Sequence, residues 1–134
     1  FRGLPTDWLA LYSSIVAKNT AGNTPADIYL AEGVLGGADN LVIGTNFVPP
    51  PSVITVIADP KLGPLQLNGG PLPMHALLAG SPAIGRGNQD VSFPQNDANT
   101  HDERGPGYPR ATGSPARVDL GAFQFDRIFF ADFD

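Results

Sequence analysis

Short apolar runs separated by turn residues are the dominant pattern along the chain. Leu, Ile and Val predominate in four of these runs, at residues 9–16, 27–30, 40–44 and 52–57. Aliphatic and β-branched residues in runs this short favour strands over helices. A helix that begins at Asp7 and covers residues 7–13 is the alternative for the first run. The first half of the chain is therefore predicted to consist of short strands.

Two of these runs resemble each other, which indicates an internal repeat. Each is a short apolar segment followed by Asn, in residues 14–19 and again in residues 40–46. Their offset falls within the roughly 20–50 residues typical of solenoid repeats. Four asparagines are candidates for a structural ladder at a corner of the chain: Asn19, Asn23, Asn40 and Asn46.

A segment rich in proline and glycine follows at residues 59–84. Its composition excludes a helix and leaves little room for regular sheet. Several aliphatic residues nevertheless offer surface by which it can be held in place: Leu62, Leu65, Leu77, Leu78, Ala83 and Ile84. We expect an ordered but irregular wrap over the end of the preceding strands.

The remaining sequence has one regular part. Residues 85–113 are dense in Gly, Asn, Asp and Pro, whereas residues 117–125 alternate between polar and apolar types. This alternation predicts a final strand that returns to the body of the protein.

The expected organisation is a single domain. Terminal strands occupy residues 1–60, a cap and closing strand occupy 61–125, and a tail occupies 126–134.

Composition and charge narrow the function classes. The 134 residues include 16 Gly and 14 Pro, which predicts many turns. The net charge is −5 and the eight Lys and Arg are scattered, so nucleic-acid binding is not expected. Without cysteine the chain forms no disulfide and no thiolate metal site. We see neither a membrane-spanning run nor a signal peptide. Because the chain begins with Phe1, we expect a processed product or a piece of a longer protein.

The most promising polar group consists of Asp102, Arg104, Arg110 and Asp119. The favoured interpretation is an ion-pair clamp that fixes the irregular residues 85–113 to the final strand, because the arginine fork matches a carboxylate. The alternative is an active site for glycan cleavage, which requires two carboxyl groups beside the scissile bond. We assign no catalytic residue.

Two further sites are weighed against structural roles. Asp90, Asp97 and Asp102 supply loop oxygens of the kind that Ca²⁺ prefers, although solvated turn acids are the default interpretation and no cofactor is expected. Trp8, Tyr12 and Tyr29 are candidates for a carbohydrate-stacking surface, with packing between strands as the alternative.

His75 is interpreted as a structural residue, because no second histidine lies near it in the sequence.

A series of motifs in the second half carries a family resemblance. In order they are Asp59-Pro60, Leu62-Gly63-Pro64-Leu65, Asn68-Gly69-Gly70-Pro71, His75-Ala76-Leu77-Leu78, Gly80-Ser81-Pro82-Ala83-Ile84, His101-Asp102-Glu103-Arg104-Gly105, Pro109-Arg110 and Val118-Asp119-Leu120-Gly121-Ala122-Phe123. This series resembles the C-terminal region of choice-of-anchor Q domain proteins, and the likeness spans residues 11–124. Gly85 and Gln124 depart from it, because the family usually has Asp and Glu at these positions.

The resemblance implies an all-β fold: the C-terminal coils of a right-handed parallel β-helix with an irregular, loop-rich cap. It also implies an exported bacterial protein, secreted or at the cell surface, and the tail resembles those of some Gram-negative secreted proteins. The family supplies no established catalytic residues, so none are transferred.

The function expected from these observations is a non-enzymatic structural and adhesion module that caps a β-helix. The alternative is the C-terminal part of a β-helical polysaccharide-degrading enzyme whose active site lies upstream. A third candidate is a subunit of an extracellular assembly. The expected partners are preceding β-helix coils in the same or another chain, a second copy of the chain, or a polysaccharide.

Overall fold

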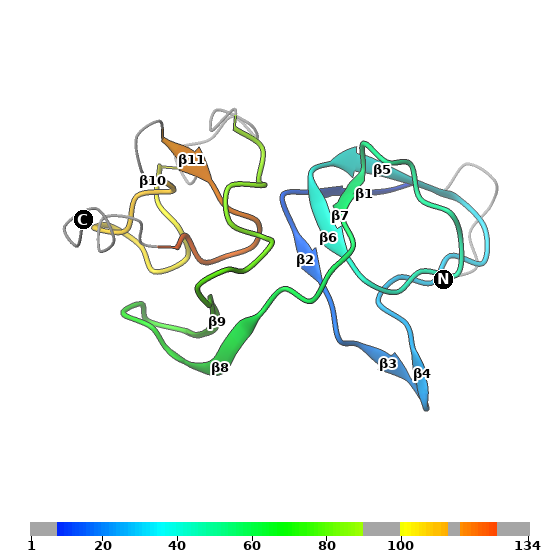
Figure 1. The fold of residues 1–134 in the computed structure, drawn as a ribbon, viewed down its shortest axis with the longest axis horizontal. Coiled ribbons are helices and arrows are strands. Elements are labelled where there is room, and N and C mark those ends of the chain that lie inside the picture. The colour runs from blue at the N-terminus through cyan, green and yellow to red at the C-terminus, as the bar shows by residue number, and fades with distance from the viewer. Residues whose placement is uncertain (1–7, 90–99, 113–115, 126–134) are drawn as a thin grey trace.

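The computed structural model describes residues 8–89, 100–112 and 116–125 (Figure 1). Within these ranges the regular structure consists of short β-strands without an α-helix. The strands are β1 (Trp8–Tyr12), β2 (Ile15–Val16), β3 (Thr20–Ala21), β4 (Thr24–Pro25), β5 (Val34–Ala38), β6 (Asn40–Val42), β7 (Ile54–Val56), β8 (Leu62–Leu67), β9 (Pro73–Leu77), β10 (Ala111–Thr112) and β11 (Arg117–Val118). The alternative helix over residues 7–13 is therefore wrong, since β1 occupies residues 8–12 of this segment, while Asp7 lies outside the described residues.

Parallel pairing organises the first half of the chain. β1 pairs with β5 over its full length, from Trp8 opposite Val34 to Tyr12 opposite Ala38. β6 lies between β2 and β7 and is parallel to both. The similar apolar runs noted in the sequence thus lie side by side, with Ile15 opposite Leu41.

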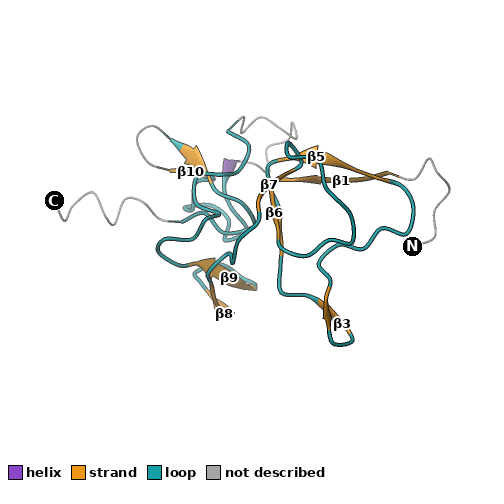
Figure 2. Cartoon of the chain, turned by 45° about the vertical axis from the view of Figure 1, so that its right-hand side comes forward, coloured by secondary structure: helices purple, strands orange, loops and turns teal. Residues whose placement is uncertain are grey.

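The corners between these strands also repeat. Ser13, between β1 and β2, and Asp39, between β5 and β6, both have positive φ, at 48° and 56°. Residues other than glycine rarely adopt this left-handed backbone conformation. At each of these two corners the chain therefore changes direction sharply within one residue. In the sequence, the β3–β4 hairpin lies between β2 and β5. It projects from the body of the protein, and the label β3 marks it in Figure 2.

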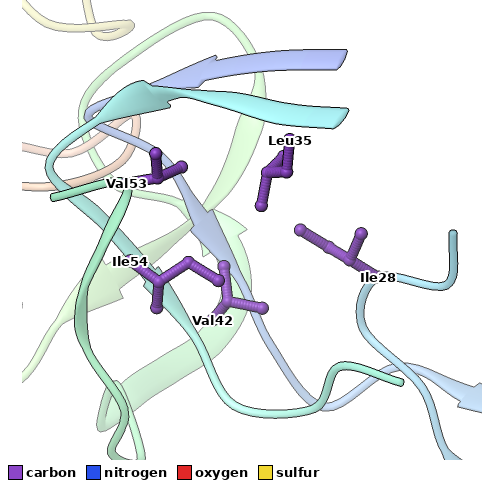
Figure 3. Packing of buried hydrophobic residues seen from close by; sticks show 5 residues of the cluster. All are labelled: Ile28, Leu35, Val42, Val53 and Ile54. Atoms are coloured by element: carbon purple, nitrogen blue, oxygen red, sulfur yellow. The ribbon is translucent and has the colours of Figure 1, made fainter. Parts of the chain in front are cut away.

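The core of the first half is aliphatic. Ile28, Leu35, Val42, Val53 and Ile54 are buried, and their side chains converge on a common interior (Figure 3). They come from four segments: Ile28 from the loop after β4, Leu35 from β5, Val42 from the end of β6, and Val53 and Ile54 from where β7 begins. Burial of such side chains stabilises each of them by about 1.5–3 kcal/mol relative to exposure.

The second half contains two antiparallel pairs, β8–β9 and β10–β11. Its buried cluster consists of Leu41, Leu77, Ala83 and Leu120. Leu41 comes from β6, so the first half of the chain contributes a buried side chain to the cluster of the second half. The remaining described segments of this half are irregular, and side-chain hydrogen bonds described below help to fix them.

The predicted right-handed parallel β-helix, with its coils in residues 1–60, is wrong for this structure. The described strands fall into five small sheets, three of which are antiparallel pairs, and the largest sheet has three strands. A β-helix needs long faces of sheet that continue from turn to turn. Here left-handed corners, a register shift between Asn40 and Leu41, and the prolines at 49–51 interrupt the strands.

Two predictions about the second half also need correction. Residues 62–77 are not an irregular wrap but the antiparallel hairpin β8–β9. Leu65 and Leu78 are 63% and 49% exposed rather than held against the body. The predicted final strand is shortened to Arg117–Val118, because beyond it the chain bonds mainly to side chains rather than to a neighbouring strand.

Candidate functional site

A buried ion pair forms the centre of the second half. Arg104 Nε lies 3.1 and 3.0 Å from the two carboxylate oxygens of Asp102, and Arg104 Nη2 lies 2.7 Å from Asp102 Oδ2. The side chains are 8% and 0% exposed. The guanidinium lies 4.0 Å from the ring centre of Tyr108 and 4.1 Å from that of Phe123. It is therefore packed against two aromatic rings while it neutralises the carboxylate.

The two buried carboxylates also bind the main chain. Asp102 accepts hydrogen bonds from the N–H groups of Arg104 at 2.9 Å and of Gln124 at 2.7 Å. Asp119 accepts from Gly85 N–H at 2.6 Å and from Phe125 N–H at 2.7 Å. Hydrogen bonds to charged acceptors are the stronger kind. These carboxylates thus replace the strand partners that this irregular chain lacks.

Gln124 completes the arrangement. Its side chain is fully buried, accepts from Asp119 N–H at 2.9 Å, and donates to Thr112 Oγ1 at 3.1 Å and to Arg117 O at 2.9 Å. We call Asp102, Arg104, Asp119 and Gln124 the C-terminal clamp. In the part of the chain that the structure describes, no buried side-chain nitrogen or oxygen lacks a hydrogen-bond partner.

Arg110 lies beside the C-terminal clamp, but it contacts the main chain of Asp119 instead of forming the predicted ion pair with a carboxylate. Its Nη2 donates to the main-chain oxygen of Asp119 at 3.2 Å rather than to a carboxylate. Burial lowers the pKa of Arg110, and the nearby carboxylates of Asp102, Asp119 and Glu103 offset only part of this effect. The structure thus brings the four predicted residues together, with Asp102 and Arg104 as the direct pair.

The sequence analysis missed Gln124 and Thr112. In the sequence, Gln124 stands out only as a departure from the family pattern. Its fully buried amide lies at the end of the alternating run at residues 117–125. A polar residue at an inward position of such a run is the signal that identifies it, because a buried amide requires several partners.

The proposed calcium residues do not form a described site. Asp90 and Asp97 lie outside the described residues, and Asp102 is engaged by Arg104. Within the described ranges, no group of three or more His, Cys, Asp or Glu side chains is arranged to hold a metal ion.

An apolar pocket lies at the β1 end of the molecule and brings two of the three predicted aromatic residues together. Its volume is about 350 Å³. The residues that line it are Trp8, Leu9, Ile28, Tyr29, Leu30, Glu32, Gly33 and Val34. Tyr12, the third predicted aromatic, is not among them and lies at the other end of β1. We call this cavity the β1 pocket.

Trp8 has a defined position at this pocket. Its indole lies against Gly36 of the neighbouring strand, where any Cβ atom would clash with the indole nitrogen. Trp8 is 67% exposed and Tyr29 is 68% exposed, so both rings present surface to the solvent. Large exposed aromatic side chains beside an apolar hollow are typical of binding surfaces.

A second apolar hollow of about 180 Å³ lies where the two halves meet, with Ile15, Leu77, Leu120 and Phe123 among its lining residues. His75 is at this hollow, and its Nδ1 lies 2.7 Å from Gly63 O. This contact is compatible with the structural interpretation of His75.

Two polar side chains connect the parallel passes of the first half. The buried amide of Asn40 donates to Leu11 O at 2.9 Å and to Val53 O at 2.8 Å, and accepts from Ser14 N–H at 3.0 Å. Asp27 Oδ2 accepts from Gly44 N–H at 2.8 Å, and Asp27 Oδ1 accepts from Asn19 N–H at 2.9 Å.

Comparisons with known proteins add no family to this picture. The chain matches no protein-family model, no curated protein and no solved structure. Among the described residues, no helix has the length and apolar character needed to cross a membrane. The resemblance to choice-of-anchor Q domain proteins therefore stays a prediction from the motifs alone.

Proposed function

We propose that this chain is a structural and adhesion module of a secreted or cell-surface protein and is not an enzyme. The C-terminal clamp is the observation that carries the proposal. Its charged and amide groups are buried and directed at main-chain groups. They give a fixed shape to a chain rich in glycine and proline that has no disulfide. Such rigidity suits a module that must persist outside the cell.

The arrangement of Asp102 and Asp119 favours this role over glycan cleavage. The two residues are 5% and 0% exposed, and each accepts two main-chain hydrogen bonds. A glycosidase needs its two carboxyl groups beside the sugar, one to donate a proton and one to act as base or nucleophile. Carboxylates committed to the main chain in this way support a structural role.

Protease resistance tests the proposal. We expect the purified chain to resist thermolysin, and Arg104→Ala to be cleaved at least about tenfold faster, because cleavage follows the population of the opened state. Arg86→Ala, which changes an exposed arginine, is the matched control and should leave the rate unchanged. Rapid cleavage of the wild-type chain between residues 100 and 125 would contradict a rigidifying clamp.

The enzymatic alternative has its own readout. The purified chain is incubated with pectin, alginate and xylan, and new reducing ends are measured. We expect none above the buffer control. Release of sugar by the wild-type chain that disappears in Asp119→Asn would overturn the non-enzymatic assignment.

A further inference from the structure

The β1 pocket presents two accessible aromatic rings beside a single charge. Trp8 and Tyr29 line it and are 67% and 68% exposed, so both rings offer surface to a ligand. Glu32 is the one charged residue of the lining. Among the described residues, no Lys, Arg or His forms an ion pair with Glu32. An apolar hollow with aromatic rings and one uncompensated carboxylate therefore has the composition of a site for a cation that also carries apolar surface.

The loop side of this pocket is fixed by hydrogen bonds to its main chain. Asn46 Oδ1 accepts from Leu30 N–H at 2.9 Å, and Asn46 Nδ2 donates to Leu30 O at 2.8 Å. The N–H of Ile28 donates to Gly44 O at 3.0 Å. Tyr29 lies between these two anchored residues in the sequence. The segment that carries the Tyr29 ring is therefore held in place without a ligand, and the main-chain groups of Leu30 are already engaged.

We propose that the β1 pocket binds a small organic cation through a quaternary ammonium group, with the rings of Trp8 and Tyr29 against its alkyl substituents and Glu32 as the counter-charge. The face of an aromatic ring is negative, and tryptophan is the strongest aromatic partner for a cation. The volume of the pocket, about 350 Å³, falls within the range of about 300–1,000 Å³ that is typical of small-molecule sites.

The hydrogen-bonding capacity of the pocket distinguishes a quaternary from a primary ammonium group. A primary ammonium group has three N–H donors, which lose their water partners when the group enters an apolar hollow. Apart from Glu32 and the polar atoms of the two rings, the lining side chains have no hydrogen-bonding group. A quaternary ammonium group has no N–H donor, so it enters the pocket without leaving a donor unpaired. The same shortage of polar groups disfavours a sugar.

The sign of the charge selects a free cation over a zwitterion. Glu32 lies at the pocket, and the chain as a whole has a net charge of −5. A carboxylate or phosphate on the same small molecule would lie near the Glu32 carboxylate and be repelled by it. We therefore expect a cation without an anionic group, such as choline, to bind more tightly than betaine or the phosphocholine headgroup of a lipid.

The inference goes beyond the proposed structural role and can fail independently of it. The C-terminal clamp lies in the second half of the chain, and none of its four residues lines the β1 pocket. Loss of choline binding with unchanged protease resistance would remove this inference alone. Rapid proteolysis with intact choline binding would remove the structural proposal alone.

The first experiment compares ligands on the wild-type chain and so depends on no substitution. Trp8 is the single tryptophan and lines the pocket, so its emission reports occupancy. We expect choline chloride to change this emission in a saturable way, relative to sodium chloride at the same ionic strength. The neutral analogue of choline, in which carbon replaces the charged nitrogen, has the same shape and should bind at least about fivefold more weakly. Ethanolamine, betaine and glycerophosphocholine should also bind more weakly than choline.

Two pairs of variants identify the residues. Glu32 and Glu103 are the two glutamates of the chain, and Glu103 is an exposed residue outside the pocket. Glu32→Gln should weaken choline binding at least about threefold, whereas Glu103→Gln removes the same charge elsewhere and should not. Tyr29→Leu removes the ring but keeps an apolar side chain, and it should weaken binding by a similar factor. Tyr29→Phe keeps the ring and should bind as the wild type does. Far-UV circular dichroism checks that each variant is folded.

Several results would overturn the inference. One is a Trp8 emission that choline leaves unchanged or changes without saturation. Equal binding of choline and its neutral analogue would assign an apolar pocket without recognition of charge. Equal weakening by Glu32→Gln and Glu103→Gln would show that only the net charge of the chain matters. Binding of cello-oligosaccharides in place of choline would assign the aromatic residues to a sugar. Tighter binding of glycerophosphocholine than of choline would assign the pocket to a lipid headgroup.

Discussion

Residues 8–57 and residues 60–125 satisfy their backbone groups in two different ways. The first region uses parallel strand pairs over an aliphatic core, with Asn40 and Asp27 as connecting polar groups. The second region contains the β8–β9 hairpin, but after it few described residues lie in strands, and Asp102, Asp119 and Gln124 bind the main chain there. Buried polar groups must be hydrogen-bonded in both cases.

The difference has a consequence for how each region responds to change. Strand pairs distribute their hydrogen bonds over many residues, so one substitution removes a small part of the total. The C-terminal clamp concentrates them on four side chains, and Arg104 neutralises a carboxylate that binds two main-chain N–H groups. We therefore expect single substitutions in the clamp to cost more free energy than single substitutions in the strand region.

The largest effect is expected for Arg104→Ala. The substitution leaves the carboxylate of Asp102 buried without its cation and removes a side chain packed on Tyr108 and Phe123. Removal of one partner from a buried ion pair typically lowers the free energy of unfolding by about 3–5 kcal/mol. Urea denaturation followed by circular dichroism measures the change, with Arg86→Ala as the control. If Arg104→Ala lowered the free energy of unfolding no more than Arg86→Ala does, the stability of the C-terminal clamp would not depend on Arg104.

An intermediate effect is expected for Asn40→Ala in the strand region. Its amide binds Leu11 O and Ser14 N–H at the corner between β1 and β2, and Val53 O directly before β7. Unsatisfied buried groups cost about 1–3 kcal/mol each, and relaxation toward water reduces the sum, so we expect a loss of about 2–3 kcal/mol. Asn46→Ala is the control, because Asn46 is exposed and binds Leu30 alone. If Asn40→Ala proved more costly than Arg104→Ala, the proposed contrast between the regions would be reversed.

The smallest effect is expected for Asp27 and depends on pH. Partial burial raises the pKa of Asp27, but hydrogen bonds from Asn19, Gly44 and Ile43 together outweigh it and hold the pKa below its ordinary value of 3.8. A carboxyl group whose pKa is lowered by folding stabilises the protein fully above its unfolded pKa. This contribution is lost as the pH falls from 3.8 through the lower folded pKa.

The matching experiment compares melting temperatures of the wild type and Asp27→Asn from neutral pH down to about pH 3. We expect the wild type to melt at higher temperature near neutral pH and the difference to shrink in acid. A difference that stayed constant over this range would show that the ionised carboxylate of Asp27 contributes nothing.

The strand region is also the part that could be predicted best from the sequence. The runs containing Ile15–Val16 and Asn40–Val42 became β2 and β6, which lie side by side as their similarity indicated. Local aliphatic patterning is sufficient to place such segments. The predicted β-helix is absent from the described residues, which form five small sheets instead. Continuous sheet depends on the conformations of corners and loops, which the apolar pattern does not specify.

The second region was harder to predict for two physical reasons. The prolines of residues 59–84 argued against sheet, yet Pro64 and Pro73 are accommodated in a two-stranded hairpin, where half of the N–H groups need no strand partner. The Asn68-Gly69-Gly70 turn between apolar runs was the available signal for this hairpin. Gln124 acquires its role from Thr112 and Arg117, which only the tertiary fold brings beside it.

β6 links the two regions in a way that bears on how this sequence can be divided. Its neighbouring residues face opposite sides, so Leu41 belongs to the cluster with Leu120 while Val42 belongs to the cluster with Ile28. A chain cut after residue 57 would leave the fully buried Leu41 facing water, and the severed C-terminal part would lack one wall of its interior. The smallest unit that recombination could transfer intact is therefore both regions together.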